Sequence, residues 1–185
     1  MTDTREFVAR VQDMKSSLVD PIITPRFAPS CTRELMTSLG QLAADKDVRI
    51  QTHLSECQAE IDWVAELEPW AQNYTDVYDQ TGLLTDKTIL AHGVYLTPDQ
   101  LKVISGAGAA IAHCPNSNNA IRSGNMDVVR YRGMKIGLGT DASGGNIITS
   151  MNYIIQPFLH LRKTKAKEHF QKSFEVMLNK SLERT

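Results

Sequence analysis

Short apolar runs with β-branched residues recur along this chain, and each is followed by a segment with helical spacing. The five runs lie at residues 22–27, 48–53, 88–96, 106–115 and 135–143. Strands that alternate with helices in this way build a parallel sheet through right-handed crossovers. We therefore predict an α/β fold whose parallel sheet is covered on both faces.

Each predicted strand ends in polar residues, and these recur at the spacing of one strand and one helix. Arg26, His53, His92, His113 and Asp141 are separated by 27, 39, 21 and 28 residues. In (β/α)8 barrels the reacting groups lie at such strand ends. A complete barrel needs eight units and about 250 residues, whereas these 185 residues hold about five units. The prediction is an incomplete TIM-like barrel, with residues 1–185 as one partial barrel domain.

The helical segments are predicted from apolar spacing and from capping residues. Thr97-Pro-Asp-Gln100 matches a capping box with proline at the first helical position, so a helix begins there. A first helix starts after Thr2 or Thr4, with its apolar positions at Phe7, Val11, Met14 and Leu18. Residues 116–119 are predicted to form a polar loop. Further helices are expected around Leu35 to Leu42, at 57–68, 126–131, 147–162 and 165–182.

Composition excludes several classes of partner. A formal net charge of -1 provides no field that would attract nucleic acid or an anionic membrane. No apolar run approaches the ~20 residues that span a bilayer. The three cysteines, Cys31, Cys57 and Cys114, form no Cys-x-x-Cys pair, which is typical of reduced thiols. We expect a soluble cytoplasmic protein with a small polar ligand.

The strand ends carry residues suited to metal chemistry. His53 ends one strand, Glu56 opens the next helix, and Asp141 follows a buried strand. Imidazole and carboxylate suit a zinc ion with an open position for water, and a nearby glutamate can shuttle protons. Taken alone, each residue has an ordinary interpretation, because an isolated His-x-x-Glu usually marks a solvated helix face, and His92 fits a packed strand end equally well.

Arg26 and Phe27 lie at the neighbouring strand end and fit a planar ligand. Its face would stack on Phe27 and its polar edge would accept hydrogen bonds from the guanidinium group. The alternative is a surface arginine beside a core phenylalanine. His113 and Cys114 are predicted to be site wall or packing.

Five motifs, taken in order, resemble the amidohydrolase superfamily and, within it, the guanine deaminase family. They are Thr24-Pro-Arg-Phe-Ala28, Gln51-Thr-His-Leu-Ser-Glu56, Leu90-Ala-His-Gly93, Ala112-His-Cys-Pro-Asn-Ser-Asn118 and Gly139-Thr-Asp-Ala142. The resemblance implies barrel strands four to eight, a zinc ion as cofactor and a homodimer in the full-length family. It also implies hydrolysis of guanine to xanthine and ammonia.

The same resemblance assigns roles to residues of this chain. His53 and Asp141 would bind zinc, and Glu56 would shuttle protons with help from Asp141. Arg26 and Phe27 would hold the purine against His53, Glu56 and Asp141. His92 would line the site near the attacked carbon.

The sequence departs from the family pattern in two respects: it shows neither the His-x-His pair of the first barrel strand nor the flanking small β domain. Two alternatives to a guanine deaminase segment therefore stay open. One is another amidohydrolase, such as an adenosine or S-adenosylhomocysteine deaminase or a triazine hydrolase. The other is a truncated, non-catalytic form that acts by association, because a barrel that lacks three strands exposes its sheet edges.

Overall fold

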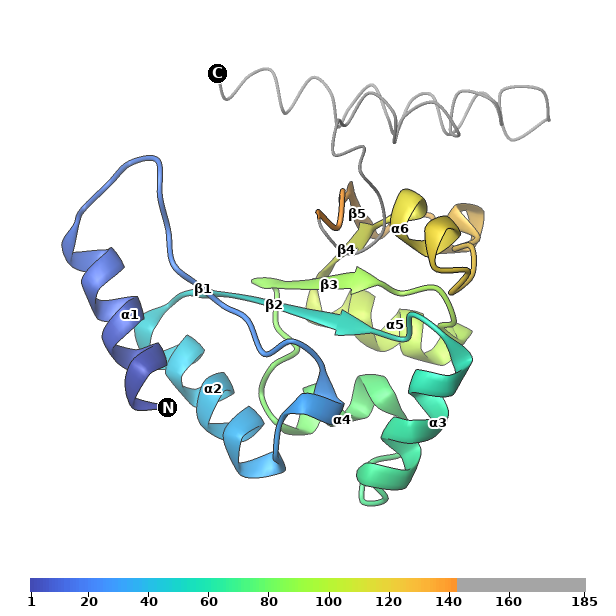
Figure 1. The fold of residues 1–185 in the computed structure, drawn as a ribbon, viewed down its shortest axis with the longest axis horizontal. Coiled ribbons are helices and arrows are strands. Elements are labelled where there is room, and N and C mark those ends of the chain that lie inside the picture. Colours follow the sequence, from blue (N-terminus) through green and yellow to red (C-terminus); the bar gives the residue numbers. More distant parts are fainter. Residues whose placement is uncertain (143–185) are drawn as a thin grey trace.

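A five-stranded parallel sheet forms the centre of the structure, a computed structural model that describes residues 1–142. The strand order follows the sequence, β1-β2-β3-β4-β5, as in one arc of a barrel wall (Figure 1). The strands are β1 Ile22–Ile23, β2 Arg49–Leu54, β3 Thr88–His92, β4 Ala110–His113 and β5 Lys135–Leu138. The predicted α/β class and the incomplete barrel architecture are confirmed.

Helix α1 precedes β1, and the other helices lie between successive strands. Helices α2 to α5 gather on one side of the sheet (Figure 1). The helix bounds are α1 Thr2–Asp13, α2 Arg33–Lys46, α3 Gln58–Leu67, α4 Tyr74–Gln80, α5 Pro98–Ala107 and α6 Pro115–Ala120. Two short 3-10 helices, η1 Ala28–Ser30 and η2 Val128–Tyr131, complete the described elements. The helices predicted at 147–162 and 165–182 lie outside the described residues.

The sheet is buried on the helical face and only partly buried on the other face. Ile50, Leu90 and Ile111 are 0 to 1% exposed, and they alternate along their strands with exposed or half-buried residues. This alternation contradicts the expectation of a sheet covered on both faces. The physical reason is that α2 to α5 supply apolar contacts to one face alone.

The capping box at the start of α5 is confirmed in full. The Thr97 hydroxyl accepts from the Gln100 backbone N–H, and the Gln100 side chain accepts from the Thr97 backbone N–H. These two bonds satisfy amides that have no partner within the helix. A short side-chain pattern was therefore enough to place this helix boundary.

Several predicted boundaries were wrong. Helix α5 continues to Ala107, which shortens the run predicted at 106–115 to the four residues of β4. β3 stops at His92, because His92 and Gly93 both have positive φ angles, 69° and 58°, which end an extended strand. Residues 116–119, predicted as a loop, lie within helix α6. Helix α4 was not predicted, although Asn73 caps its N-terminus.

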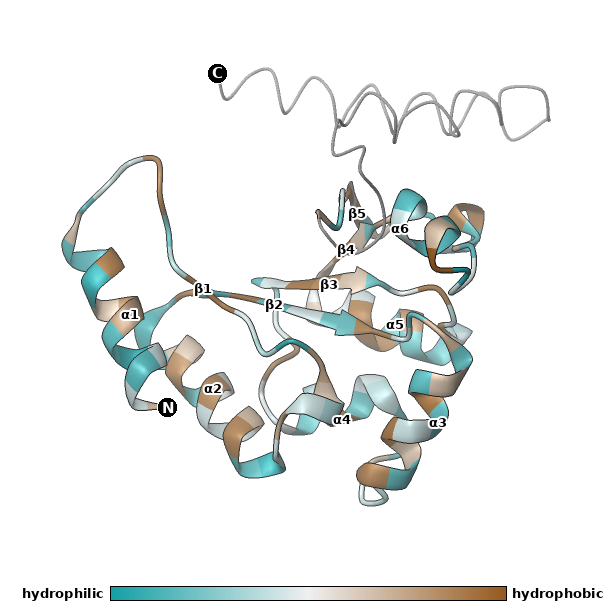
Figure 2. Ribbon diagram, in the orientation of Figure 1, coloured by the Kyte–Doolittle hydropathy of each residue, from teal (hydrophilic) through white to brown (hydrophobic). Residues whose placement is uncertain are grey.

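The buried face of α1 also differs from the prediction. Val8 is the buried residue of this helix, whereas Phe7 is 53% exposed and Met14 is 69% exposed. Leu18, 93% exposed, lies in the loop after the helix, where hydrophobic residues sit far from the sheet (Figure 2). The apolar spacing correctly indicated a helix but not the side that packs.

Candidate active site

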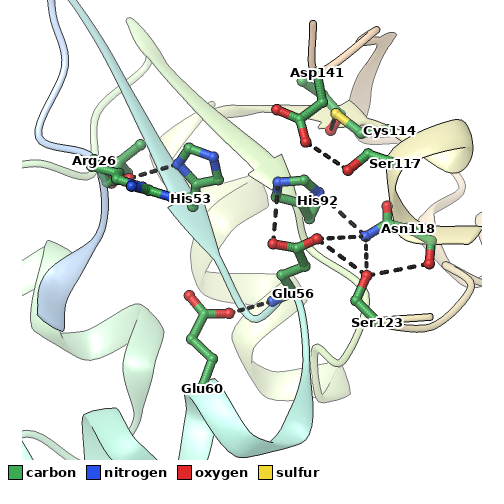
Figure 3. Close-up of polar contacts among 12 residues, drawn as sticks. Arg26, His53, Glu56, Glu60, His92, Cys114, Ser117, Asn118, Ser123 and Asp141 are labelled. Atoms are coloured by element: carbon green, nitrogen blue, oxygen red, sulfur yellow. Dashed lines mark hydrogen bonds and ion pairs between the residues drawn. The ribbon is translucent and has the colours of Figure 1, made fainter. Parts of the chain in front are cut away.

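Three potential metal ligands converge at the carboxyl ends of the strands. His53 comes from β2, His92 ends β3, and Asp141 follows β5. One ligand atom from each lies within 4.8 Å of the other two. The His53 and His92 rings stack with their centroids 5.1 Å apart. Residues separated by 88 positions in the sequence therefore meet at one edge of the sheet, as the barrel topology predicts (Figure 3).

The His53 ring is oriented by the end of β1. Its Nδ1 lies 2.6 Å from the carbonyl oxygen of Arg26, which also accepts from the His53 backbone N–H at 3.0 Å. Because a carbonyl oxygen only accepts, Nδ1 must carry the proton. Nε2 is then the nitrogen left to act as a ligand, as in metal sites whose histidines bond to backbone carbonyls.

His92 is almost completely enclosed, with 1% of its surface exposed. Burial lowers the pKa of its imidazole, against the opposing charge of Glu56, so the neutral ring is favoured. Nδ1 lies 3.3 Å from the Asn118 amide nitrogen. Among the described residues Nε2 has no hydrogen-bond partner, although Glu56 Oε2 lies 3.5 Å away.

Glu56 lies beside the two histidines and is held at both ends. Its backbone N–H donates to Glu60 Oε2 at 2.8 Å. Its Oε1 accepts from Asn118 Nδ2 at 3.2 Å and from Ser123 Oγ at 3.1 Å. The carboxylate, 19% exposed, thus faces the site and retains access to water.

Asp141 completes the cluster from the C-terminal side of β5. Its Oδ2 accepts a hydrogen bond of 2.6 Å from Ser117 Oγ on α6. Its backbone adopts a left-handed conformation with φ 48°. The second carboxylate oxygen is not used in that bond, which leaves it able to contact a metal or a water molecule.

Arg26 and Phe27 lie at the same edge as His53. The Arg26 guanidinium carbon is 5.5 Å from the centre of the Phe27 ring. The Phe27 ring in turn meets Trp63 of α3 in an edge-to-face contact, with 6.1 Å between centroids. Arg26 is exposed and Phe27 is half-buried. Trp63 was not predicted from the sequence, where it is one aromatic residue on an amphipathic helix.

His113 and Cys114 form part of the buried wall, as expected. Burial lowers the pKa of His113 to about 4 and raises the pKa of Cys114 to about 11. Both groups are therefore neutral near pH 7. A Cβ atom at Gly139 would lie 2.7 Å from the Cys114 sulfur, so Cys114 packs directly against the chain leading to Asp141.

Sequence reasoning missed the serine and asparagine residues that support the site. Ser117, Asn118 and Ser123 are buried and contact Asp141, Glu56 and His92. The signal available was the polar run 116–119 directly after the strand end at His113. This run predicts a polar loop and not helix α6, because the helix has little apolar periodicity.

The donor set fits a divalent metal ion. Two imidazoles and a carboxylate offer one ligand atom each within 4.8 Å. His92 Nε2 is also buried without a hydrogen bond among residues 1–142. Such ligands suit the metals that activate water in hydrolases. A catalytic ion of this type is commonly held by three protein ligands. His92 is therefore a candidate metal ligand as well as a residue that lines the site.

Comparisons with known proteins agree with this geometry. The Amidohydrolase family pattern matches residues 1–173. The guanine deaminase of Dictyostelium discoideum is 50% identical over 147 residues, which are 78% of this chain and 33% of that protein. The guanine deaminase of Rattus norvegicus is 50% identical over 146 residues, with 77% and 32% covered. The chain thus spans about a third of the length of the curated relatives it matches.

Solved structures show the same likeness. A guanine deaminase from C. acetobutylicum with bound guanine matches with a TM-score of 0.81 and 37% identity, over 90% of this chain and 41% of that chain. A triazine hydrolase from Arthobacter aurescens matches with a TM-score of 0.70 and 25% identity, over 77% and 32%. Among the described residues, no helix is long and apolar enough to cross a membrane. On the family match and the strand-end cluster together, the chain belongs to the amidohydrolase family.

Proposed function

We propose that this chain forms the metal-binding and purine-binding portion of a guanine deaminase, which hydrolyses guanine to xanthine and ammonia. The observation that carries the proposal is the meeting of His53, His92 and Asp141 within 4.8 Å, beside the Glu56 carboxylate. The substrate is taken from relatives that are 50% identical to the chain and named guanine deaminase.

Zinc is the proposed metal, held by His53 and Asp141 with His92 next to them. A bound zinc ion would supply Lewis acidity, which makes water a better nucleophile near pH 7. Glu56 lies 3.5 Å from His92, close enough to exchange protons with groups at the cluster. Asp141 would help to remove a proton from the attacking water. His92 would remain neutral and line the site near the attacked carbon.

Arg26 and Phe27 are proposed to bind the purine. The half-buried Phe27 ring, supported by Trp63, offers a face for stacking. The Arg26 guanidinium group provides donors for a carbonyl edge, which guanine has and adenine lacks. Replacement of Arg26 therefore tests whether the substrate is guanine or another ring compound.

Three further properties are proposed on the same basis. All three cysteines are free, which supports a cytoplasmic location where thiols stay reduced. A homodimer is proposed from the family resemblance. Residues 1–185 are proposed to be one partial barrel domain.

A chimera tests the proposed activity. The part of this chain that matches over 147 residues replaces the corresponding segment of the Dictyostelium discoideum guanine deaminase, which provides the remaining barrel strands. We expect ammonia release from guanine, and loss of release in the His53→Ala and Asp141→Asn variants. Arg26→Ala should raise KM for guanine by about tenfold, the loss of one charge-assisted hydrogen bond.

The alternatives make different predictions for the same chimera. Turnover of adenosine, S-adenosylhomocysteine or a triazine, with guanine left intact, would replace guanine as the proposed substrate. Metal content of the 185-residue chain, measured by mass spectrometry, tests zinc separately. A chain without metal and a chimera without activity would together favour a non-catalytic form.

A further inference from the structure

Helix α6 reaches across the site and holds the Glu56 carboxylate. Asn118, on this helix, donates from Nδ2 to Glu56 Oε1 at 3.2 Å. Ser123, just after it, donates to the same oxygen at 3.1 Å. The two residues are also joined to each other by a hydrogen bond of 2.7 Å. Contacts between residues 62 and 67 positions apart thus fix one side-chain oxygen (Figure 3).

The orientation of the Asn118 amide is set by chemistry. An ionised carboxylate only accepts hydrogen bonds, so the amide must present its NH2 group to Glu56. The amide nitrogen also lies 3.3 Å from His92 Nδ1. The amide nitrogen thus lies between the Glu56 carboxylate and the His92 ring.

Burial makes this arrangement rigid. Asn118 is 0% exposed and Ser123 is 8% exposed. Asn118 Oδ1 is buried without a hydrogen-bond partner in the part of the chain that the structure describes. A buried polar atom left unpaired destabilises the fold, because it loses its hydrogen bonds to water. Tolerating this cost at the site is consistent with a role for the amide beyond packing.

We propose that Asn118 is a positioning residue that, with Ser123, holds Glu56 in place to transfer protons during hydrolysis. The inference rests on the proposed function, because it names the residues that hold Glu56, the proposed proton shuttle. A general base must lie within hydrogen-bond reach of the proton that it moves. Without the two donors, the carboxylate rotates about its side-chain torsions and loses that fixed placement.

The first test uses turnover by the chimera described above. Asn118→Ala should lower kcat by about 10- to 100-fold while KM stays within about threefold, as is typical for loss of a supporting contact. Asn118→Asp, which keeps the size but removes the NH2 donors, should lower kcat at least as much. Ser123→Ala should have a smaller effect, because Asn118 remains. The matched control is Asn119→Ala, an exposed asparagine on the same helix, which should leave both constants unchanged.

Two outcomes would overturn the inference. One is an Asn118→Ala variant with kcat within about twofold of the parent; the other is a rise in KM at unchanged kcat, which indicates a role in binding. If the parent chimera fails on guanine but hydrolyses another ring substrate, the proposed function is wrong, and kcat and KM are compared on that substrate instead.

A second test needs no turnover and uses the 185-residue chain. With asparagine labelled with nitrogen-15, the side-chain NH2 signal of Asn118 reports its bond to Glu56. We expect this signal to shift upfield in Glu56→Gln, where the charged acceptor is lost. It should stay in place in Glu66→Gln, which changes an exposed glutamate on α3. An unchanged signal in Glu56→Gln would contradict the proposed contact.

Discussion

At the scale of residues, the site depends on strand ends that turn sharply. His92 and Asp141 both adopt left-handed backbone conformations, with φ angles of 69° and 48°. For residues with a side chain this conformation costs about 1 to 3 kcal/mol, and it occurs often at functional sites. These turns accompany the change of direction at the strand ends, where the ligand atoms of both residues come together.

Ser117 should influence metal binding without being a ligand. Its hydroxyl donates to Asp141 Oδ2 at 2.6 Å, so Ser117→Ala frees the carboxylate to rotate. Zinc affinity, measured by titration calorimetry on the 185-residue chain, should fall by about 10- to 100-fold. Ser105→Ala, at an exposed position on α5, serves as the control. If the parent, Ser117→Ala and Ser105→Ala bind zinc with equal affinity, the hydrogen bond from Ser117 does not support Asp141 as a metal ligand.

His113 should make the chain less stable in mild acid. Burial lowers its folded-state pKa to about 4, whereas the unfolded value is about 6.5. Between these values the unfolded state binds more protons, so the free energy of unfolding falls as the pH falls. His92, whose pKa is also lowered, adds an effect of the same sign. Stability is lost below about pH 6.5 and is fully present above it.

Urea unfolding provides the measurement. From about pH 7 to about pH 5 the free energy of unfolding should decrease by about 2 kcal/mol because of His113. His113→Gln, which does not titrate in this range, should reduce the dependence on pH by that amount. If the free energy of unfolding of His113→Gln depends on pH as it does in the parent, His113 is not the cause of that dependence.

At the scale of elements, α2 packs closely against the chain that leads to β3. Gly40 of α2 is buried, and a Cβ atom there would clash with the carbonyl oxygen of Thr81 and lie 2.9 Å from the carbonyl carbon of Gly82. Both obstacles are backbone atoms, which cannot move aside like a flexible side chain. Gly40→Ala should therefore reduce the free energy of unfolding by about 1 to 3 kcal/mol.

A second glycine provides the control. Gly106, in α5, has nothing within 4 Å of an added Cβ atom. Gly106→Ala should stabilise the chain by up to about 1 kcal/mol, because alanine favours the helix. In thermal unfolding, the Tm should fall for Gly40→Ala and rise for Gly106→Ala if the contact at Gly40 is as described. Shifts of the same sign would contradict it.

Local signals in the sequence predicted elements well and their contacts less well. The capping box located α5, because both of its bonds form within four residues. Periodicity found α1 but chose Phe7 and Met14 as its apolar face, since only tertiary packing determines that Val8 is buried. Strand ends correctly indicated where His53 and Asp141 meet. The bonds from Asn118 and Ser123 to Glu56 could not be predicted, because they depend on how α6 sits over the strand ends.

At the scale of the whole molecule, the sheet of residues 1–142 ends in two edge strands, β1 and β5. The five described strands pair in sequence order, and β5 does not pair with β1 to close a barrel. Edge strands present unpaired backbone groups that invite pairing with other chains. The apolar side chain of Phe7, 53% exposed, lies close to the β1 edge, where it borders a hollow with Ile22 and Ile23.

The β1 edge should therefore promote association of the 185-residue chain with itself. Thr24 is exposed immediately after β1, so Thr24→Lys places a charge where a neighbouring strand would pair. Charged side chains at edges oppose such pairing. Light scattering after size-exclusion chromatography should show a smaller mass at high concentration than for the parent. Thr37→Lys, which adds the same charge at an exposed position on α2, should leave association unchanged. If both lysine variants reduce association equally, net charge is the cause and the β1 edge is not the contact.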